Sequence, residues 1–150
     1  TEFKENFFNY LDNLPPSQVE TYAKEFWENE FPQNFNKELL NRFKVARDKG
    51  TELFCATGGL EVYVKPLFNL FSISGFAGTQ AEYVNGTYKV MGKACKDEEK
   101  IRRISKHYGN FGFTITEAYS DSKEDILEEA EKAFLVEDGE IKPYPKNSKT

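Results

Sequence analysis

A hydroxyl side chain, Thr57, stands at the end of a short apolar run and is followed by two glycines. The run is Leu53–Ala56, and Gly58 and Gly59 come directly after Thr57. We expect a buried strand that ends in a tight turn, with a helix behind it from about residue 60 to residue 71. A hydroxyl and exposed backbone N–H groups at such a turn can bind an anion. A purely structural role, in which Thr57 caps the helix and the glycines form the turn, explains the same residues.

Two carboxylates, Asp121 and Asp125, follow a second predicted strand. Alternation and β-branched residues predict a strand over Phe111–Tyr119, and a helix is expected from Ser122 to about residue 132. Asp121 at the strand tip and Asp125 one turn into the helix can face the same point, and such a pair suits a hard cation such as Mg²⁺. A capping box that begins at Ser122, together with the helix dipole, also explains Asp125. Both interpretations stay open.

A lysine, Lys100, lies in the first turn of a helix that opens at Asp97 and ends at Gly109. A cation there opposes the helix dipole by a few tenths of a kcal/mol up to about 1 kcal/mol. An ammonium held toward a bound anion would offset that energy. The alternative is a solvated surface lysine beside Glu98 and Glu99.

The order of these groups along the chain points to one kind of site. From residue 34 onward, strands alternate with helices, which predicts an α/β fold with a mostly parallel sheet covered on both faces. Ligands of such sheets bind beyond the carboxyl ends of the strands. There Thr57 and Lys100 would neutralise phosphoryl oxygens, and Asp121 and Asp125 would hold Mg²⁺. These are parts of a phosphoryl-transfer site that lacks a nucleophile.

The other segments carry signals for ordinary elements. Helices are expected over residues 3–14, from a capping box of Ser17 and Glu20 to Phe31-Pro32, and from Asn34 or Asn36 to Gly50. A hairpin is expected at Asn85-Gly86, a strand over residues 133–136, and an exposed tail over the last dozen residues, which include Lys142, Lys146 and Lys149.

Composition excludes several classes of protein. The chain has 150 residues, of which 39% are hydrophobic, so intrinsic disorder is excluded. A net charge of −5 argues against a nucleic-acid-binding surface, and no run is long enough to span a membrane. Cys55 and Cys95 are far apart and are expected to be reduced thiols in a cytoplasmic protein. One histidine, His107, argues against a histidine triad or a multi-histidine metal site.

Three stretches together resemble motifs of the haloacid dehalogenase superfamily of phosphatases, in particular its phosphoserine phosphatase-like branch. Residues 53–59 (LFCATGG) resemble the second motif, 97–104 (DEEKIRRI) the third and 118–125 (AYSDSKED) the fourth. Residues 78–88 are similar to the hairpin stretch of this branch. The resemblance covers roughly residues 34–136.

The resemblance implies a fold, a cofactor and roles for the site residues. The fold would be a three-layer Rossmann-like core over residues 34–150, with residues 1–33 as part of a small helical cap. Thr57 and Lys100 would be catalytic, and Thr57, Gly58 and Lys100 would bind the phosphate of a small phosphorylated substrate. Asp121 would bind Mg²⁺ directly with Asp125 in support. An aspartate would attack the phosphoryl group to give an aspartyl-phosphate.

The chain departs from the family in its first motif, Asp-x-Asp, which supplies the nucleophile on the central strand. No Asp-x-Asp occurs in the 150 residues. We expect a longer protein, whose missing N-terminal segment is a partner of this chain, and we expect this chain alone to be inactive. The alternatives are a non-catalytic binding or scaffolding domain of the same fold and a phospho-acceptor receiver domain. The latter lacks a helical cap, and this chain offers no strand for its acceptor aspartate.

The fourth motif departs as well. Ser120 and Ser122 stand where phosphoserine phosphatases usually carry glycines, and Glu124 stands in place of an asparagine. The resemblance therefore implies a small phosphomonoester as substrate without assigning phosphoserine.

Overall fold

The computed structural model describes residues 12–145, and the chain divides into two compact units, residues 1–96 and 97–150. The helix expected over residues 3–14 falls mostly outside the described residues. No helix among residues 12–145 is both long and apolar enough to cross a membrane.

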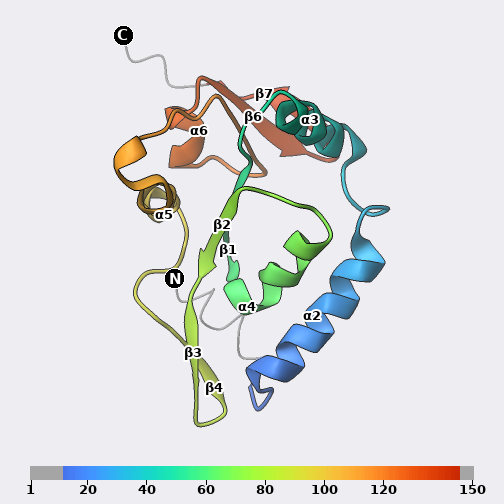
Figure 1. The fold of residues 1–150 in the computed structure, drawn as a ribbon, viewed down its shortest axis with the longest axis vertical. Coiled ribbons are helices and arrows are strands. Elements are labelled where there is room, and N and C mark those ends of the chain that lie inside the picture. Colours follow the sequence, from blue (N-terminus) through green and yellow to red (C-terminus); the bar gives the residue numbers. More distant parts are fainter. Residues whose placement is uncertain (1–11, 146–150) are drawn as a thin grey trace. The chain divides into compact units, whose positions relative to one another are not determined.

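A parallel pair of strands forms the centre of the first unit (Figure 1). β1 (Phe54–Leu60) pairs with β2 (Gly75–Thr79), and their register shifts between Ala56 and Leu60. The prediction that the strand ends at Thr57 in a tight turn is wrong, because β1 continues through both glycines. A Cβ on Gly78 would lie 2.8 Å from the Gly59 carbonyl oxygen. The glycines here therefore permit an irregular, close approach of two backbones.

The segment after β1 is shorter and more broken than the helix expected over residues 60–71. α4 (Glu61–Val64) is followed by a 3₁₀ turn, η2 (Lys65–Asn69). Pro66 lacks the N–H that would continue α-helical bonding, which explains the change of helix type. β2 was not predicted, because a five-residue strand with two glycines carries almost no periodic signal.

The Asn85-Gly86 hairpin is confirmed. β3 (Ala81–Val84) and β4 (Thr87–Val90) are antiparallel, and both turn residues have a positive φ, 50° and 81°. This backbone is the one that favours Asn-Gly in two-residue hairpins.

Among the described residues, two α-helices precede these strands. α2 (Pro16–Glu30) begins two residues earlier than a Ser17 N-cap implies. Its N-cap is Pro15 and no side-chain cap bond forms, so the capping box predicted at Ser17 is wrong. α3 (Lys37–Asp48) is capped by Asn36, whose side chain accepts from the Leu39 N–H.

Two hydrogen bonds join α2 and the residues just before it to the rest of the first unit. The Trp27 indole N–H donates to the Tyr63 carbonyl at 2.9 Å, which ties α2 to α4. The Tyr88 hydroxyl donates to the Leu14 carbonyl at 2.7 Å, next to a core of Val19 and Leu60. The boundary expected at residue 33 lies inside this unit, and the assignment of residues 1–33 to a cap stays a prediction.

The Tyr88 hydrogen bond gives a testable pH dependence. Burial, with Tyr83 as a smaller cause, raises the pKa of Tyr88 above its usual 10.0. The folded chain then holds this proton more tightly than the unfolded chain, so its contribution is complete below about pH 10 and is lost as pH rises toward the folded-state pKa. Tyr88→Phe should lower the free energy of unfolding by about 1 kcal/mol at pH 7. It should also flatten the decline above pH 10.

Urea unfolding of both proteins at pH 7 and at about pH 10.5 measures this effect. Tyr22→Phe, at a side chain that is 55% exposed, is the matched control. Equal pH slopes for Tyr88→Phe and the unmutated chain would contradict the assignment.

Within residues 97–145, the second unit contains a three-stranded sheet and two α-helices. The helices are α5 (Glu98–Tyr108) and α6 (Asp125–Glu129). β5 (Glu117–Ser120) pairs in parallel with β6 (Lys132–Glu137), which pairs antiparallel with β7 (Glu140–Pro143). Buried Ala118, Leu127, Ala130 and Ala133 form the core beneath α6.

Three expectations for this unit need correction. A strand is predicted over Phe111–Tyr119, but the observed strand, β5, begins only at Glu117. Gly109–Phe111 forms a 3₁₀ turn (η3) instead, and Gly112 has a φ of 68°. The helix expected from Ser122 begins only at Asp125 and is five residues long (α6). Residues 140–143 of the expected tail form β7, because Asp138-Gly139, with φ of 50° and 78°, makes a hairpin turn, and residues 146–150 of that tail lie outside the described residues. The predicted α/β class with parallel strands is confirmed.

Candidate functional site

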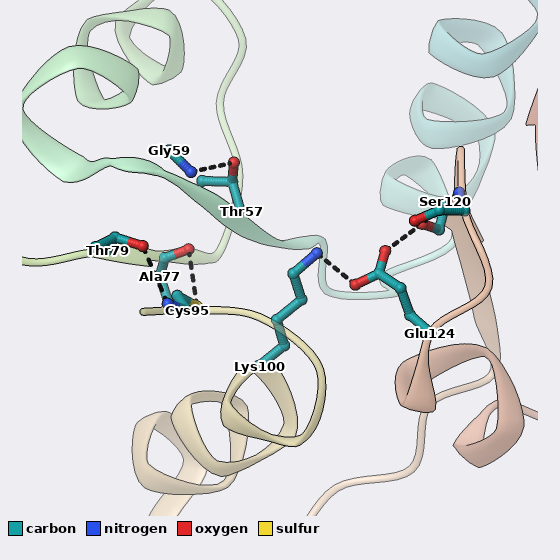
Figure 2. A network of polar contacts seen from close by, with 9 residues as sticks. Thr57, Gly59, Ala77, Thr79, Cys95, Lys100, Ser120 and Glu124 are labelled. Carbon is teal, nitrogen blue, oxygen red and sulfur yellow. Dashed lines mark hydrogen bonds and ion pairs between the residues drawn. The ribbon is translucent and has the colours of Figure 1, made fainter. Parts of the chain in front are cut away.

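A backbone N–H two residues along β1 holds the Thr57 hydroxyl in place. Its Oγ1 accepts a hydrogen bond from the Gly59 N–H at 3.1 Å, and the side chain is half-buried (Figure 2). A hydroxyl that accepts one bond still carries a proton to donate. Thr57 is therefore fixed by the backbone beside it and keeps the donor that an anion would need.

A fully buried threonine, Thr79, supports the same segment from β2. Its hydroxyl donates to the Gly58 carbonyl at 2.8 Å and accepts from the Cys95 N–H at 3.0 Å. Cys95 Sγ in turn contacts the Ala77 carbonyl at 3.7 Å. One hydroxyl therefore links the irregular part of β1 to the end of β2 and to the segment around Cys95, and Figure 2 shows its contact with Cys95. No pattern of spacing in the sequence indicates this role.

Replacing Thr79 should loosen this part of the first unit. Thr79→Val keeps the shape but leaves the Gly58 carbonyl and the Cys95 N–H without the hydroxyl. Each such loss at a buried group costs about 1–3 kcal/mol, so we expect unfolding free energy to fall by about 3 kcal/mol. Chemical denaturation measures it, and Thr79→Ser, which keeps the hydroxyl, is the control. If Val and Ser variants are equally stable, the hydroxyl is not what supports Gly58.

Lys100 is mostly buried and ion-paired. Its Nζ lies 2.6 Å from Glu124 Oε1, and the two side chains are only 14% and 11% exposed. The other oxygen of Glu124 accepts a hydrogen bond from the Ser120 hydroxyl, and Ser120 Oγ accepts from the Ser122 N–H at 3.2 Å. Lys100 is therefore not a solvated surface lysine. One carboxylate joins the first turn of α5 to the end of β5 (Figure 2).

The two aspartates lie on either side of Glu124 in the segment that leaves β5. Asp121 follows the last residue of β5, Asp125 is the first residue of α6, and both are exposed. The capping box expected from Ser122 does not form, since α6 has no side-chain cap bond and the Ser122 N–H donates back to Ser120. Capping therefore does not explain Asp125.

Asp121 and Asp125 offer the carboxylate oxygens that suit a magnesium ion, and their convergence on one ion stays a prediction. Within residues 12–145, no group of three or more histidines, cysteines and acids is placed to hold a metal ion. Mg²⁺ usually binds through one or two carboxylates and takes its other ligands from water and phosphate oxygens. Asp121 and Asp125 could supply those carboxylates.

The predicted site residues are divided between the two units. Thr57 and Gly58 belong to the first unit, and Lys100, Asp121 and Asp125 belong to the second. Their convergence on one phosphoryl group stays a prediction. In the sequence, Glu124 stands out only as a departure from the family motif. Its pairing with Lys100 could not be predicted, because no local sequence pattern connects residues 24 positions apart.

Comparison with known proteins addresses the family directly. A family model described as haloacid dehalogenase-like hydrolase matches residues 1–127, which include Thr57, Lys100, Asp121 and Asp125. None of the curated proteins matches this chain.

A solved structure agrees with the fold. The crystal structure of a protein with unknown function from Bordetella pertussis Tohama I is similar with a TM-score of 0.70 and 16% identity. The match covers 88% of this chain and 63% of that chain, so this chain spans less than two thirds of that protein's length. At this identity the likeness shows the fold alone. With a family model matching most of the chain, and the motif-bearing residues inside it, this chain belongs to the haloacid dehalogenase-like hydrolases.

Proposed function

We propose that this chain is part of a Mg²⁺-dependent phosphomonoesterase that acts on a small phosphorylated metabolite. The observation that carries the proposal is the setting of Lys100. This lysine of the third motif is mostly buried, and a carboxylate beside the two aspartates of the fourth motif holds its ammonium. Most lysines are exposed, and one that is buried and bonded in this way has a defined position from which to act on an anion.

The roles of the other residues follow from their chemistry. The Lys100 ammonium would reduce the repulsion between an attacking carboxylate and the phosphoryl oxygens. The Thr57 hydroxyl, oriented by the Gly59 N–H, would donate to one of those oxygens together with the Gly58 amide. Phosphoryl transfer depends mostly on such positioning and charge stabilisation.

Asp121 would bind the magnesium ion directly, and Asp125 would support it. When bound, the ion would neutralise charge on the phosphoryl group. The exposure of both carboxylates leaves them accessible to the ion and its waters.

The nucleophile would come from a segment that is not part of this chain and carries the Asp-x-Asp motif. Attack by that aspartate would form an aspartyl-phosphate, which water then hydrolyses. In the sheets that residues 12–145 form, β1 and β5 each have a neighbouring strand on one side only. A further parallel strand is therefore compatible with either edge.

The substrate would be a small phosphomonoester, and phosphoserine is not assigned. Ser120 and Glu124 occupy positions where phosphoserine phosphatases usually carry glycine and asparagine, and here Ser120 is bonded to Glu124, which is paired with Lys100. Because of this different set of polar groups, phosphoserine is not assigned.

Phosphate release by the full-length gene product tests the proposal. The protein is incubated with a panel of phosphorylated metabolites, with Mg²⁺ or with EDTA, and inorganic phosphate is measured. We expect release from at least one compound with Mg²⁺ and none with EDTA. No release from any compound, together with no Asp-x-Asp in the coding sequence upstream of Thr1, would favour a non-catalytic binding domain instead.

A further inference from the structure

The Lys100–Glu124 pair has a consequence for the affinity of the site. The ammonium that would bind a phosphoryl group already has a carboxylate 2.6 Å away. A phosphate that approaches Lys100 must therefore either displace Glu124 or bind with a like charge close by. Either event weakens binding, because displacing Glu124 breaks the ion pair and two like charges a few ångströms apart repel each other.

The hydrogen bonds of Glu124 also fix the position of the Lys100 ammonium. Glu124 uses both oxygens, one for Lys100 and one for the Ser120 hydroxyl, and Ser120 is itself fixed by the Ser122 N–H. Long lysine side chains have many rotamers, so a bonded partner on the end of β5 restricts the ammonium to one place. The second carboxylate oxygen makes that partner rigid.

We propose that Glu124 is a positioning residue that fixes the Lys100 ammonium for turnover while lowering the affinity of the site for phosphate. The inference rests on the proposed function, since it takes Lys100 to be the phosphate-binding lysine. It adds a residue that the family resemblance did not assign, at a position where this chain departs from the family pattern. A merely structural role for Glu124 predicts the opposite effect on phosphate affinity.

Glu124→Gln separates the two roles. Glutamine has nearly the same shape and keeps an oxygen for Lys100 and a polar group for Ser120, but it removes the negative charge. We expect inorganic phosphate to bind about tenfold more tightly to this variant, because one nearby like charge is gone. We expect turnover to fall about tenfold, because a neutral amide holds the ammonium less firmly.

The binding is measured by calorimetric titration of inorganic phosphate into the full-length protein at saturating Mg²⁺. Glu124→Asp, which restores the charge, should return phosphate affinity toward that of the unmutated protein. Glu140→Gln is the matched control, since Glu140 also pairs with a lysine, Lys142, at 3.5 Å, but both side chains are exposed. Its phosphate affinity should not change.

The outcomes distinguish this inference from the proposed function. Phosphate that binds the unmutated protein and binds Glu124→Gln with equal or lower affinity overturns the role of Glu124 and leaves the phosphatase intact. Phosphate that binds none of the proteins with Mg²⁺ present overturns the phosphate site, and the inference with it. Tighter binding to Glu124→Gln with slower turnover supports both.

Discussion

Asp121→Asn in the full-length protein is expected to lower turnover at least about a hundredfold. Asparagine keeps the size and one oxygen of the side chain but removes the negative charge that binds Mg²⁺. Loss of one contact that stabilises charge in the transition state typically lowers turnover by about 10²–10³. Asp121 is exposed and follows the end of β5, so the substitution should leave the core of Ala118 and Leu127 unchanged.

Steady-state phosphate release at increasing Mg²⁺ concentrations measures this effect. The variant should also need more Mg²⁺ to reach half of its own maximal rate. Asp138→Asn is the matched control, because Asp138 lies in the β6–β7 turn with a φ of 50°, a backbone that asparagine also adopts readily. A turnover for Asp121→Asn near that of Asp138→Asn would remove Asp121 from the metal site.

Lys100→Ala should have an effect of similar size for a different reason. The substitution removes the cation that reduces repulsion between the incoming carboxylate and the phosphoryl group, and we expect turnover to fall at least about a hundredfold. It also leaves Glu124, only 11% exposed, without its ammonium partner. Some loss of stability is therefore expected, as for other buried pairs that lose one member.

A second variant separates catalysis from folding. Lys100→Gln keeps a hydrogen-bond donor for Glu124 and removes the charge, so it should be more stable than Lys100→Ala but equally slow. Lys142→Ala, at an exposed lysine that pairs with Glu140, is the control for removal of a lysine. Thermal unfolding and turnover are measured on the same samples. Near-normal turnover in Lys100→Gln would refute the assignment of Lys100.

The elements with strong local signals could be predicted from the sequence. Asn36 caps a helix, Asn85-Gly86 forms a two-residue hairpin, and the α/β class follows from alternating elements. At Asn36 and at Asn85-Gly86, the residues themselves favour the local backbone conformation. The Asp138-Gly139 turn carries the same kind of signal, and β7 could have been predicted from it.

Elements that depend on tertiary contacts could not be predicted in this way. β1 passes through Gly58 and Gly59 because β2 lies against it, with Gly78 giving the close approach, and glycines alone suggest a turn. Alternation and β-branched residues over Phe111–Tyr119 favour a strand, yet only Glu117–Ser120 pairs with β6. Pairing partners, rather than local propensity, decide these boundaries.

The candidate site shows the same division. Lys100, Asp121 and Asp125 could be predicted as candidate site residues from their places at element ends and from the family resemblance. The roles of Glu124 and Thr79 could not be predicted. Glu124 pairs with a residue 24 positions away and Thr79 bonds to one 21 positions away, and no motif in the sequence marks either residue. Such partners become visible only when the chain is folded.

The most direct measurement is a crystal structure of the full-length protein with Mg²⁺ and a tetrahedral phosphate analogue such as vanadate. We expect the Thr57 hydroxyl and the Lys100 ammonium to contact the same anion, and an oxygen of Asp121 to bind the magnesium ion that shares it. Side-chain tips of these residues and Asp125 separated by more than about 12 Å, a span too wide for one ion and one phosphoryl group, would contradict the proposed phosphatase site.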